Sequence, residues 1–175
     1  MIRRRWLGAG VAVAAAAAGA GAWWRRREEQ GRGQPLDAAF WALRFDRPEG
    51  GELRLDALRG QPLLVNFWAT WCPPCVKELP DINQFYGEAK SKGWQVLGLA
   101  VDQAEPVRAF LQKTPLDFPI ALAGPEGLAL VRELGNPAGG LPFSVTFDAA
   151  GEIRWRRLGV SRLEELRQLA ELATT

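Results

Sequence analysis

The chain has 175 residues, with 22 Lys and Arg against 20 Asp and Glu, no His and two Cys. This length is sufficient for one domain with a substantial core and one additional segment. The net charge of +2 says little about partners, and no basic stripe mixed with aromatic residues lies outside the N-terminal arginine clusters, so we expect no nucleic-acid partner.

The N-terminal segment has the pattern of a membrane anchor. Residues 6–24 are uncharged and lie between the arginines of residues 3–5 and those of residues 25–27. As a helix, this stretch would be about 28 Å long, which matches the hydrocarbon core of a bilayer. We therefore predict a signal anchor, or transmembrane segment, over residues 1–27. A signal peptide cleaved near residues 19–22 is the alternative, but the arginines that follow disfavour cleavage.

The expected location follows from this anchor. Its short N-terminal flank should stay in the cytoplasm, so the rest of the chain should cross the membrane. Residues 3–7 also weakly resemble a twin-arginine export signal. Residues 28–37 are polar and Gly-rich and are expected to be a linker. We predict a single-pass protein of a bacterial inner membrane, with the domain of residues 38–175 in the periplasm; a cleaved, soluble periplasmic form is the alternative.

Beyond the linker, short apolar strands alternate with amphipathic helices. In chain order we predict a hairpin of strands at 41–45 and 52–55, a buried strand at 62–68, a helix at 74–92 kinked at Pro80, a strand at 95–101, a helix at 105–113, a strand at 118–122, a helix at 126–134, an antiparallel pair at 143–147 and 153–157, and a helix at 161–173. Ser161 and Glu164 are expected to form a capping box for the last helix. This order indicates the α/β class, with a mixed β-sheet flanked by helices.

The two cysteines, Cys72 and Cys75, lie between the predicted buried strand and the helix that follows it. Two thiols at this spacing can close a small disulfide. A thiol at a helix N-terminus is exposed to the positive end of the helix dipole, which favours the nucleophilic thiolate. The pair therefore indicates thiol–disulfide exchange, with the Cys72–Cys75 disulfide as the redox group and no dissociable cofactor.

Other uses of the pair are less compatible with the sequence. A structural disulfide that closes so short a loop constrains the unfolded chain little. A metal site needs three or four soft or imidazole ligands, whereas the chain has two Cys, no His and one Met. Covalent haem attachment needs His where Val76 stands. A thiol peroxidase, with Cys72 as the peroxidatic and Cys75 as the resolving thiol, stays open because Thr70 lies near Cys72.

With these residues in view, the chain resembles the membrane-anchored thioredoxin-like proteins of the TlpA/ResA/CcmG group over about residues 39–172. The resemblance is carried by residues 66–75 (Asn-Phe-Trp-Ala-Thr-Trp-Cys-Pro-Pro-Cys), residues 78–80 (Glu-Leu-Pro) and residues 139–148. It implies a thioredoxin-like fold with an N-terminal hairpin and a helix–strand insertion between residues 101 and 134. It also implies an enzyme, an extracytoplasmic thiol–disulfide oxidoreductase.

The resemblance assigns roles to the residues around the cysteine pair. Cys72 would attack the substrate disulfide, and Cys75 would then resolve the mixed disulfide. Trp71 would line the approach to the pair, with surface packing as its alternative role. Pro142 would be a cis-proline, preceded by Leu141, and its strand would bind an extended substrate.

Four further positions differ from thioredoxin itself or are expected to modify the site. Asn66 stands where thioredoxin has a buried Asp, and it cannot accept a proton. Glu78, three residues after the second cysteine, would modulate the thiol pKa values and relay a proton, with a solvated helix carboxylate as the alternative. Pro73 and Pro74 remove two N–H groups near the thiolates and are expected to affect the reduction potential.

The implied partners are protein disulfides, for example in apocytochromes c or a copper-site protein. A protein that reduces disulfides in an oxidising compartment needs an electron donor, and a membrane protein is expected because glutathione cannot be assumed there. The alternative from another class is a non-catalytic chaperone that binds its partners in a groove at Leu141 and Pro142.

Overall fold

The computed structural model describes residues 38–172. The predicted anchor at 1–27 and the linker at 28–37 lie outside the described residues. Within residues 38–172, no helix combines the length and the apolar character that a membrane span requires.

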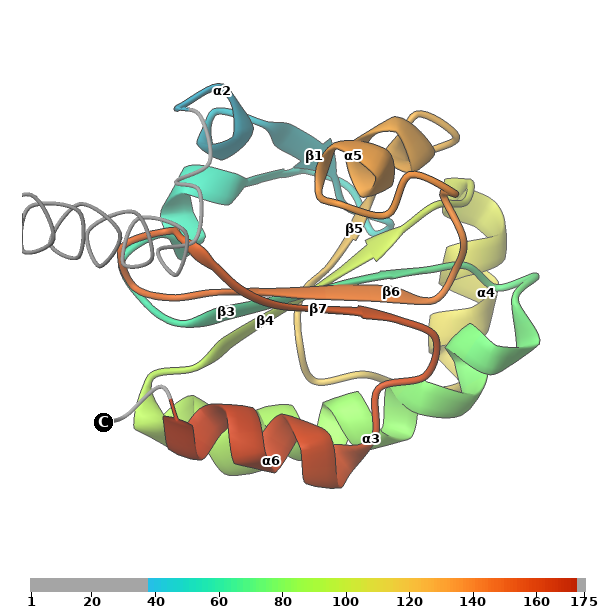
Figure 1. The fold of residues 1–175 in the computed structure, drawn as a ribbon. Helices are drawn as coiled ribbons and strands as arrows, with labels where there is room; N and C mark the ends of the chain where they lie inside the picture. The colour runs from blue at the N-terminus through green and yellow to red at the C-terminus, as the bar shows by residue number, and fades with distance from the viewer. Residues whose placement is uncertain (1–37, 173–175) are drawn as a thin grey trace, which may run out of the picture. The chain divides into compact units, whose positions relative to one another are not determined.

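Short strands and helices alternate along the described chain, as Figure 1 shows. In chain order they are α2 (Ala38–Trp41), β1 (Arg44–Asp46), β2 (Glu52–Arg54), the 3-10 helix η1 (Leu55–Leu58), β3 (Leu63–Trp68), α3 (Pro73–Ala89), the 3-10 helix η2 (Lys90–Lys92), β4 (Gln95–Ala100), α4 (Ala104–Lys113), β5 (Ile120–Leu122), α5 (Gly127–Glu133), β6 (Phe143–Phe147), β7 (Ile153–Leu158) and α6 (Leu163–Leu172).

The strands form one mixed sheet in the order β2-β1-β5-β4-β3-β6-β7. Strands β3, β4 and β5 are parallel neighbours, and the remaining pairs are antiparallel. The crossovers through α3 and α4 make the parallel pairs, because parallel strands need a long connection. The mixed sheet flanked by helices confirms the predicted fold class. The predicted insertion contributes α4 and β5, and β5 pairs with the N-terminal hairpin through β1.

Alternation along β3 divides the core into two layers. Leu63, Val65 and Phe67 pack with residues of α2, η1 and α5 on one face of the sheet. Leu64 and Trp68 pack with α3, α4 and α6 on the other face. In Figure 1, α3 and α6 lie side by side on one side of the sheet, whereas α2 and α5 lie on the opposite side. The side chains of Leu64, Asn66 and Trp68 in β3 therefore point toward the face of the sheet that α3 and α6 cover.

The predicted strand at 41–45 is wrong in its first half. Residues 38–41 form the helical turn α2, and the strand begins only at Arg44. Phe40 and Trp41 are both buried, and their rings lie 5.3 and 5.5 Å from the ring of Phe147. Successive residues of a strand point to opposite faces, so two neighbouring residues can share this contact only where the chain turns.

The predicted capping box of Ser161 and Glu164 is also wrong. Helix α6 begins at Leu163, and the N–H of Leu163 donates to Asp81 Oδ2 of α3 at 3.3 Å. Glu165, rather than Glu164, accepts from the N–H of the residue before the helix, at 3.3 Å. The helix start thus has one local partner, shifted by one residue from the predicted box, and one partner from another helix, which no local pattern contains.

Most other predicted boundaries agree with the structure within two or three residues. Helix α3 continues through Pro80 and ends at Ala89, followed by η2. The strand predicted at 118–122 is shorter, because pairing begins at Ile120, directly after Pro119.

Candidate active site

The cysteine pair lies where β3 leads into α3. Cys72 is the N-cap residue of α3 and is disulfide-bonded to Cys75. The Cys72 sulfur also accepts the N–H of Cys75 at 3.3 Å. Pro73 and Pro74 occupy the first helical positions, where an N–H has no partner within the helix and Pro costs little. The helix start therefore presents its positive end to the Cys72 sulfur.

Exposure distinguishes the two sulfurs and the residue before them. Cys72 is 5 % exposed and Cys75 is 0 % exposed, which confirms that the N-terminal cysteine is the more accessible one. Trp71 is 63 % exposed, so it is not a core residue. The exposed Trp71 therefore directly precedes the more accessible of the two cysteines.

The bond between Leu141 and Pro142 is cis, as the resemblance implied. Pro142 directly precedes β6, whose first residue, Phe143, is paired with Phe67 near the end of β3. The cis-proline is thus at the end of the sheet where β3 leads to the cysteines. The Pro142 carbonyl accepts the N–H of Gly159 at 2.9 Å, which ties this loop to the segment after β7.

Four buried polar residues form one hydrogen-bonded cluster behind the cysteine pair: Asn66 of β3, Glu78 of α3, Ser144 of β6 and Ser161 of the loop before α6, each 0 % exposed. The Asn66 amide nitrogen donates to Glu78 Oε1 at 2.7 Å and to Ser144 Oγ at 3.0 Å. The N–H of Ser161 donates to Glu78 Oε2 at 2.6 Å, and its hydroxyl is 3.1 Å from Ser144 Oγ. Both carboxylate oxygens of Glu78 are therefore bonded.

Burial raises the pKa of Glu78 to about 7, even though hydrogen bonds from Ser161 and Asn66 oppose this rise. The negative charge of Asp81 raises it further. The alternative of a solvated helix carboxylate is thus wrong. Glu78 lies one helical turn after Cys75 and can exchange a proton near neutral pH, which is the property that acid–base chemistry requires.

The structure also supplies partners that the sequence did not reveal. Ser144 and Ser161 are far from Glu78 in the chain, and the sequence indicated neither of them as a partner of Glu78; Ser161 was assigned to a helix cap instead. A signal was available only for Ser144, because it occupies a buried register position inside the apolar strand β6. An unexplained hydroxyl at such a position indicates a polar partner across the sheet.

A second carboxylate fixes the loop before the cysteines. Asp102, just after β4, accepts the Thr70 N–H at 2.9 Å and the Thr70 hydroxyl at 2.6 Å through Oδ2. Its Oδ1 accepts the N–H of Gln103 at 2.8 Å. The segment that carries Trp71 is therefore held to the C-terminal end of the neighbouring parallel strand. The Thr70 hydroxyl is already used in this clamp.

Within residues 38–172, no group of three or more His, Cys, Asp or Glu side chains is arranged to hold a metal ion.

Comparisons with known proteins agree with this geometry. The redoxin family model matches residues 38–172. The chain is 34 % identical to the thiol-disulfide oxidoreductase ResA of a Bacillus cereus strain over 119 residues, which cover 67 % of this chain and 66 % of that protein. It is 31 % identical to ResA of Bacillus thuringiensis subsp. konkukian over 127 residues, or 72 % of this chain and 71 % of that protein.

A solved structure is similar over a larger share of its own chain. It is a thioredoxin-family thiol:disulfide interchange protein from Chlorobium tepidum, with a TM-score of 0.65, 28 % identity, and coverage of 76 % of this chain and 93 % of that one. The chain spans just under two thirds of the length of the B. cereus relative. By sequence and by fold, the chain belongs to the redoxin family and is a homologue of the ResA thiol–disulfide oxidoreductases.

Proposed function

We propose that this protein is a thiol–disulfide oxidoreductase that reduces protein disulfides outside the cytoplasm. The observation that carries the proposal is the Cys72–Cys75 disulfide at the start of α3, at the same end of the sheet as the cis-bonded Pro142. A reducing turnover leaves Cys72 and Cys75 as a disulfide, so a donor of two electrons must return the pair to the dithiol before the next turnover.

In the reducing direction, the Cys72 thiolate attacks one sulfur of the substrate disulfide. An S–S bond forms between Cys72 and the substrate, and the other substrate sulfur leaves as a thiolate. The Cys75 thiolate then attacks the Cys72 sulfur, which forms the Cys72–Cys75 disulfide and releases the second substrate thiolate. Two electrons pass from the dithiol to the substrate. The greater exposure of Cys72 supports this order of attack.

Glu78 is assigned the proton exchange that accompanies these steps. Cys75 must lose its proton before it attacks, and Glu78 lies one turn further along the same buried helix face. A carboxylate with a pKa of about 7 can accept this proton and later release it at neutral pH. Asn66 contributes as a donor that holds the carboxylate, not as a proton acceptor.

The substrate is assigned to the surface around Cys72. Trp71 is exposed beside the attacking sulfur, and Leu141 precedes the cis-proline and packs against both core layers. We propose that an extended substrate segment binds between Trp71 and the loop of Leu141 and Pro142. Pro73 and Pro74 are exposed at the helix start, and their missing N–H groups are expected to affect the reduction potential.

The physiological setting is proposed from the sequence. The expected anchor at residues 1–27 would hold the protein in the bacterial inner membrane, with residues 38–175 in the periplasm. The substrates would be disulfides of apocytochromes c or of a copper-site protein, and a membrane protein would supply the electrons. An oxidising compartment makes such a dedicated donor necessary.

Trapping the mixed disulfide tests the proposed reaction. With Cys75→Ser, the Cys72 thiolate still attacks but the mixed disulfide cannot be resolved, so a covalent, reductant-sensitive adduct with the partner should accumulate in membranes of the source cell. Cys72→Ser should form no adduct and should abolish disulfide reduction. Absence of any adduct, together with peroxide-dependent turnover that requires Cys72, would establish the peroxidase instead. A Cys72→Ser protein that keeps its biological role would indicate the chaperone.

The reduction potential of the full-length chain tests the direction. Equilibration with graded thiol–disulfide buffers should give about −270 mV or lower, as for thioredoxin. A value near about −120 mV is typical of a disulfide-forming oxidant and would reverse the proposed direction.

A further inference from the structure

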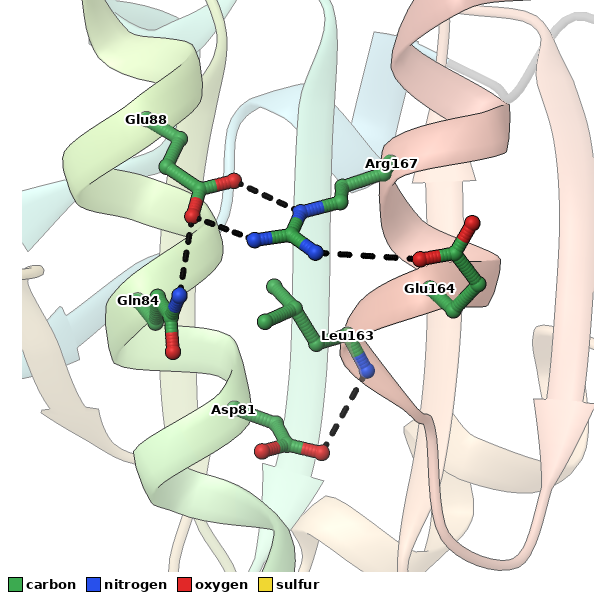
Figure 2. A network of polar contacts seen from close by, with 6 residues as sticks. All are labelled: Asp81, Gln84, Glu88, Leu163, Glu164 and Arg167. Carbon is green, nitrogen blue, oxygen red and sulfur yellow. Dashed lines mark hydrogen bonds and ion pairs between the residues drawn. The ribbon is translucent and has the colours of Figure 1, made fainter.

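Helix α3 binds helix α6 and the loop before it through several of its carboxylates. Figure 2 shows two of these contacts: Asp81 accepts the N–H of Leu163, and Glu88 accepts the Arg167 guanidinium. Nearly one turn before Asp81, Glu78 accepts the N–H of Ser161. The loop before α6 and the first residue of α6 are therefore held against α3 by hydrogen bonds to two of its carboxylates. One residue of this loop, Ser161, bonds to the buried carboxylate of Glu78.

Ser161 and Ser144 complete a closed ring of hydrogen bonds with Glu78. One arm runs from Glu78 Oε2 to the N–H of Ser161, 2.6 Å, and from the Ser161 hydroxyl to Ser144 Oγ, 3.1 Å. The other arm runs from Glu78 Oε1 to the Asn66 amide nitrogen, 2.7 Å, and from that nitrogen to Ser144 Oγ, 3.0 Å. The contact between the two serine hydroxyls thus connects the two donors to the Glu78 carboxylate, the Asn66 amide and the Ser161 N–H.

We propose that Ser144 and Ser161 are positioning residues of the redox site: their hydroxyl pair holds the Asn66 amide and the Ser161 N–H on the Glu78 carboxylate and so determines how readily Glu78 takes up and releases its proton. The proposal rests on the proposed proton exchange by Glu78. It extends the site to strand β6 and to the loop before α6, neither of which contributes a sulfur.

The groups that face Glu78 determine whether its pKa rises or falls when a serine hydroxyl is removed. From β3, β6 and the loop before α6 the facing groups are Asn66, Ser144 and Ser161, which are uncharged. From α3 the charge that acts on it is Asp81, which disfavours the carboxylate form. Hydrogen-bond donors favour the carboxylate form, and burial opposes it. Loosening the donors should therefore make Glu78 a weaker acid.

The test uses the purified full-length chain with Ser144→Ala and Ser161→Ala, each made alone and together with Glu78→Gln. Thr146→Val is the matched control, because Thr146 is a buried hydroxyl residue on the same strand as Ser144 but lies outside the ring. Two quantities are measured: the carbon-13 titration of the Glu78 carboxyl group, and the rate of disulfide reduction against pH.

Each serine variant should raise the titration midpoint of Glu78, and the midpoint of the rate profile, by about 0.5 to 1 pH unit, since a donor to a charged group is lost or loosened. Thr146→Val should move neither midpoint, and Ser161→Thr, which keeps the hydroxyl, should restore the normal values. In the Glu78→Gln background, the serine variants should produce no further change in the profile.

The outcomes separate the two proposals. If the carboxyl titration moves but the rate profile does not, the serine pair positions Glu78 as inferred, and the proton exchange proposed for Glu78 is wrong. If Glu78→Gln changes the rate profile but neither serine variant moves the carboxyl titration, the inference about the serines is overturned and the function of Glu78 stands. A shift as large with Thr146→Val as with Ser144→Ala would also overturn it, because the effect would then belong to any buried hydroxyl.

Discussion

Glu78 and Glu88 are carboxylates of the same helix; Glu78 bonds to the loop before α6, and Glu88 bonds to Arg167 within α6. Glu78 is buried, accepts only uncharged donors, and has a pKa raised to about 7. Glu88 lies on the surface, and the Arg167 guanidinium binds it through two nitrogens at 2.7 and 2.8 Å (Figure 2). That pair, with a further bond from Gln84, lowers the pKa of Glu88 to about 2.

The difference shows that the pKa of a carboxyl group on α3 depends on its exposure to solvent and on the charge of its partner, more than on the helix that carries it. Both residues are well hydrogen-bonded, so the number of bonds does not explain opposite shifts. Loss of water disfavours the ionised form of Glu78, whereas a cation in water favours the ionised form of Glu88. The buried Glu78 can therefore serve proton chemistry, whereas the exposed Glu88 connects two helices.

The largest expected effect separates the two glutamates by activity. Glu78→Gln removes the proton acceptor and should slow disulfide reduction at pH 7 by about 10²-fold, a typical contribution of general acid–base catalysis. Glu88→Gln should leave the rate unchanged, because Glu88 bonds to groups outside the redox site. The check is the rate of protein disulfide reduction from pH 5 to 9. Equal rates for the two variants would show that Glu78 has no catalytic function that Glu88 lacks.

The second effect is on stability against pH. The pKa of Glu78 is about 7 in the folded chain against an ordinary 4.5, so the native state binds the proton more tightly. The free energy of unfolding should therefore fall as pH rises from about 4.5 to about 7, by about 3 kcal/mol in total, and stay low above that.

Glu78→Gln should abolish this part of the pH dependence. Denaturant unfolding at pH 5 and pH 8, compared between wild type and Glu78→Gln, isolates the contribution from that of the other carboxylates. A wild-type protein whose stability rises over this range relative to the variant would contradict the raised pKa.

A smaller effect concerns Asp81, which lies between the two glutamates. Asp81→Asn removes the negative charge that disfavours ionised Glu78 but keeps an oxygen for the N–H of Leu163. The pKa of Glu78 should fall by about 0.3 pH unit, since the interaction of partly solvated charges is modest. Carboxyl titration measures this directly. Glu88→Gln, two turns further along, serves as the control and should leave the Glu78 titration unchanged.

The smallest effect is expected at the exposed pair. The Glu88 pKa is lowered, so the pair stabilises the fold above the ordinary carboxyl pKa and loses this contribution as pH falls towards about 2. Arg167→Met keeps most of the side-chain stem and should cause a slight loss of thermal stability at pH 7 and low salt. The loss should disappear in about 1 M salt, where exposed charges are screened. A large, salt-independent loss would mean that the stem, and not the ion pair, holds α6.

Much of the fold could be predicted because its signals are local. The apolar run that forms β3, the two cysteines and the helix after them are contiguous, so their order and chemistry follow from spacing alone. The cis bond before Pro142 is different, because a local pattern gives it a low probability; only the family resemblance indicated it. The errors, at Trp41 and Ser161, occur where a contact with a distant segment replaced the local preference.

The sequence by itself determined the group on which the proposed redox chemistry depends: Cys72 and Cys75 are close in the chain, and hydrophobic pattern and proline placement indicate a helix start after β3. It also placed Glu78 one turn beyond the cysteines. Only the tertiary structure decided the acid strength of that carboxyl group. Its donors, Ser144 and Ser161, arrive from β6 and from the loop before α6, and its burial results from packing α3 and α6 on one face of the sheet. Acid strength depends on solvation and on neighbours in space, and neither is written in the order of residues along one helix.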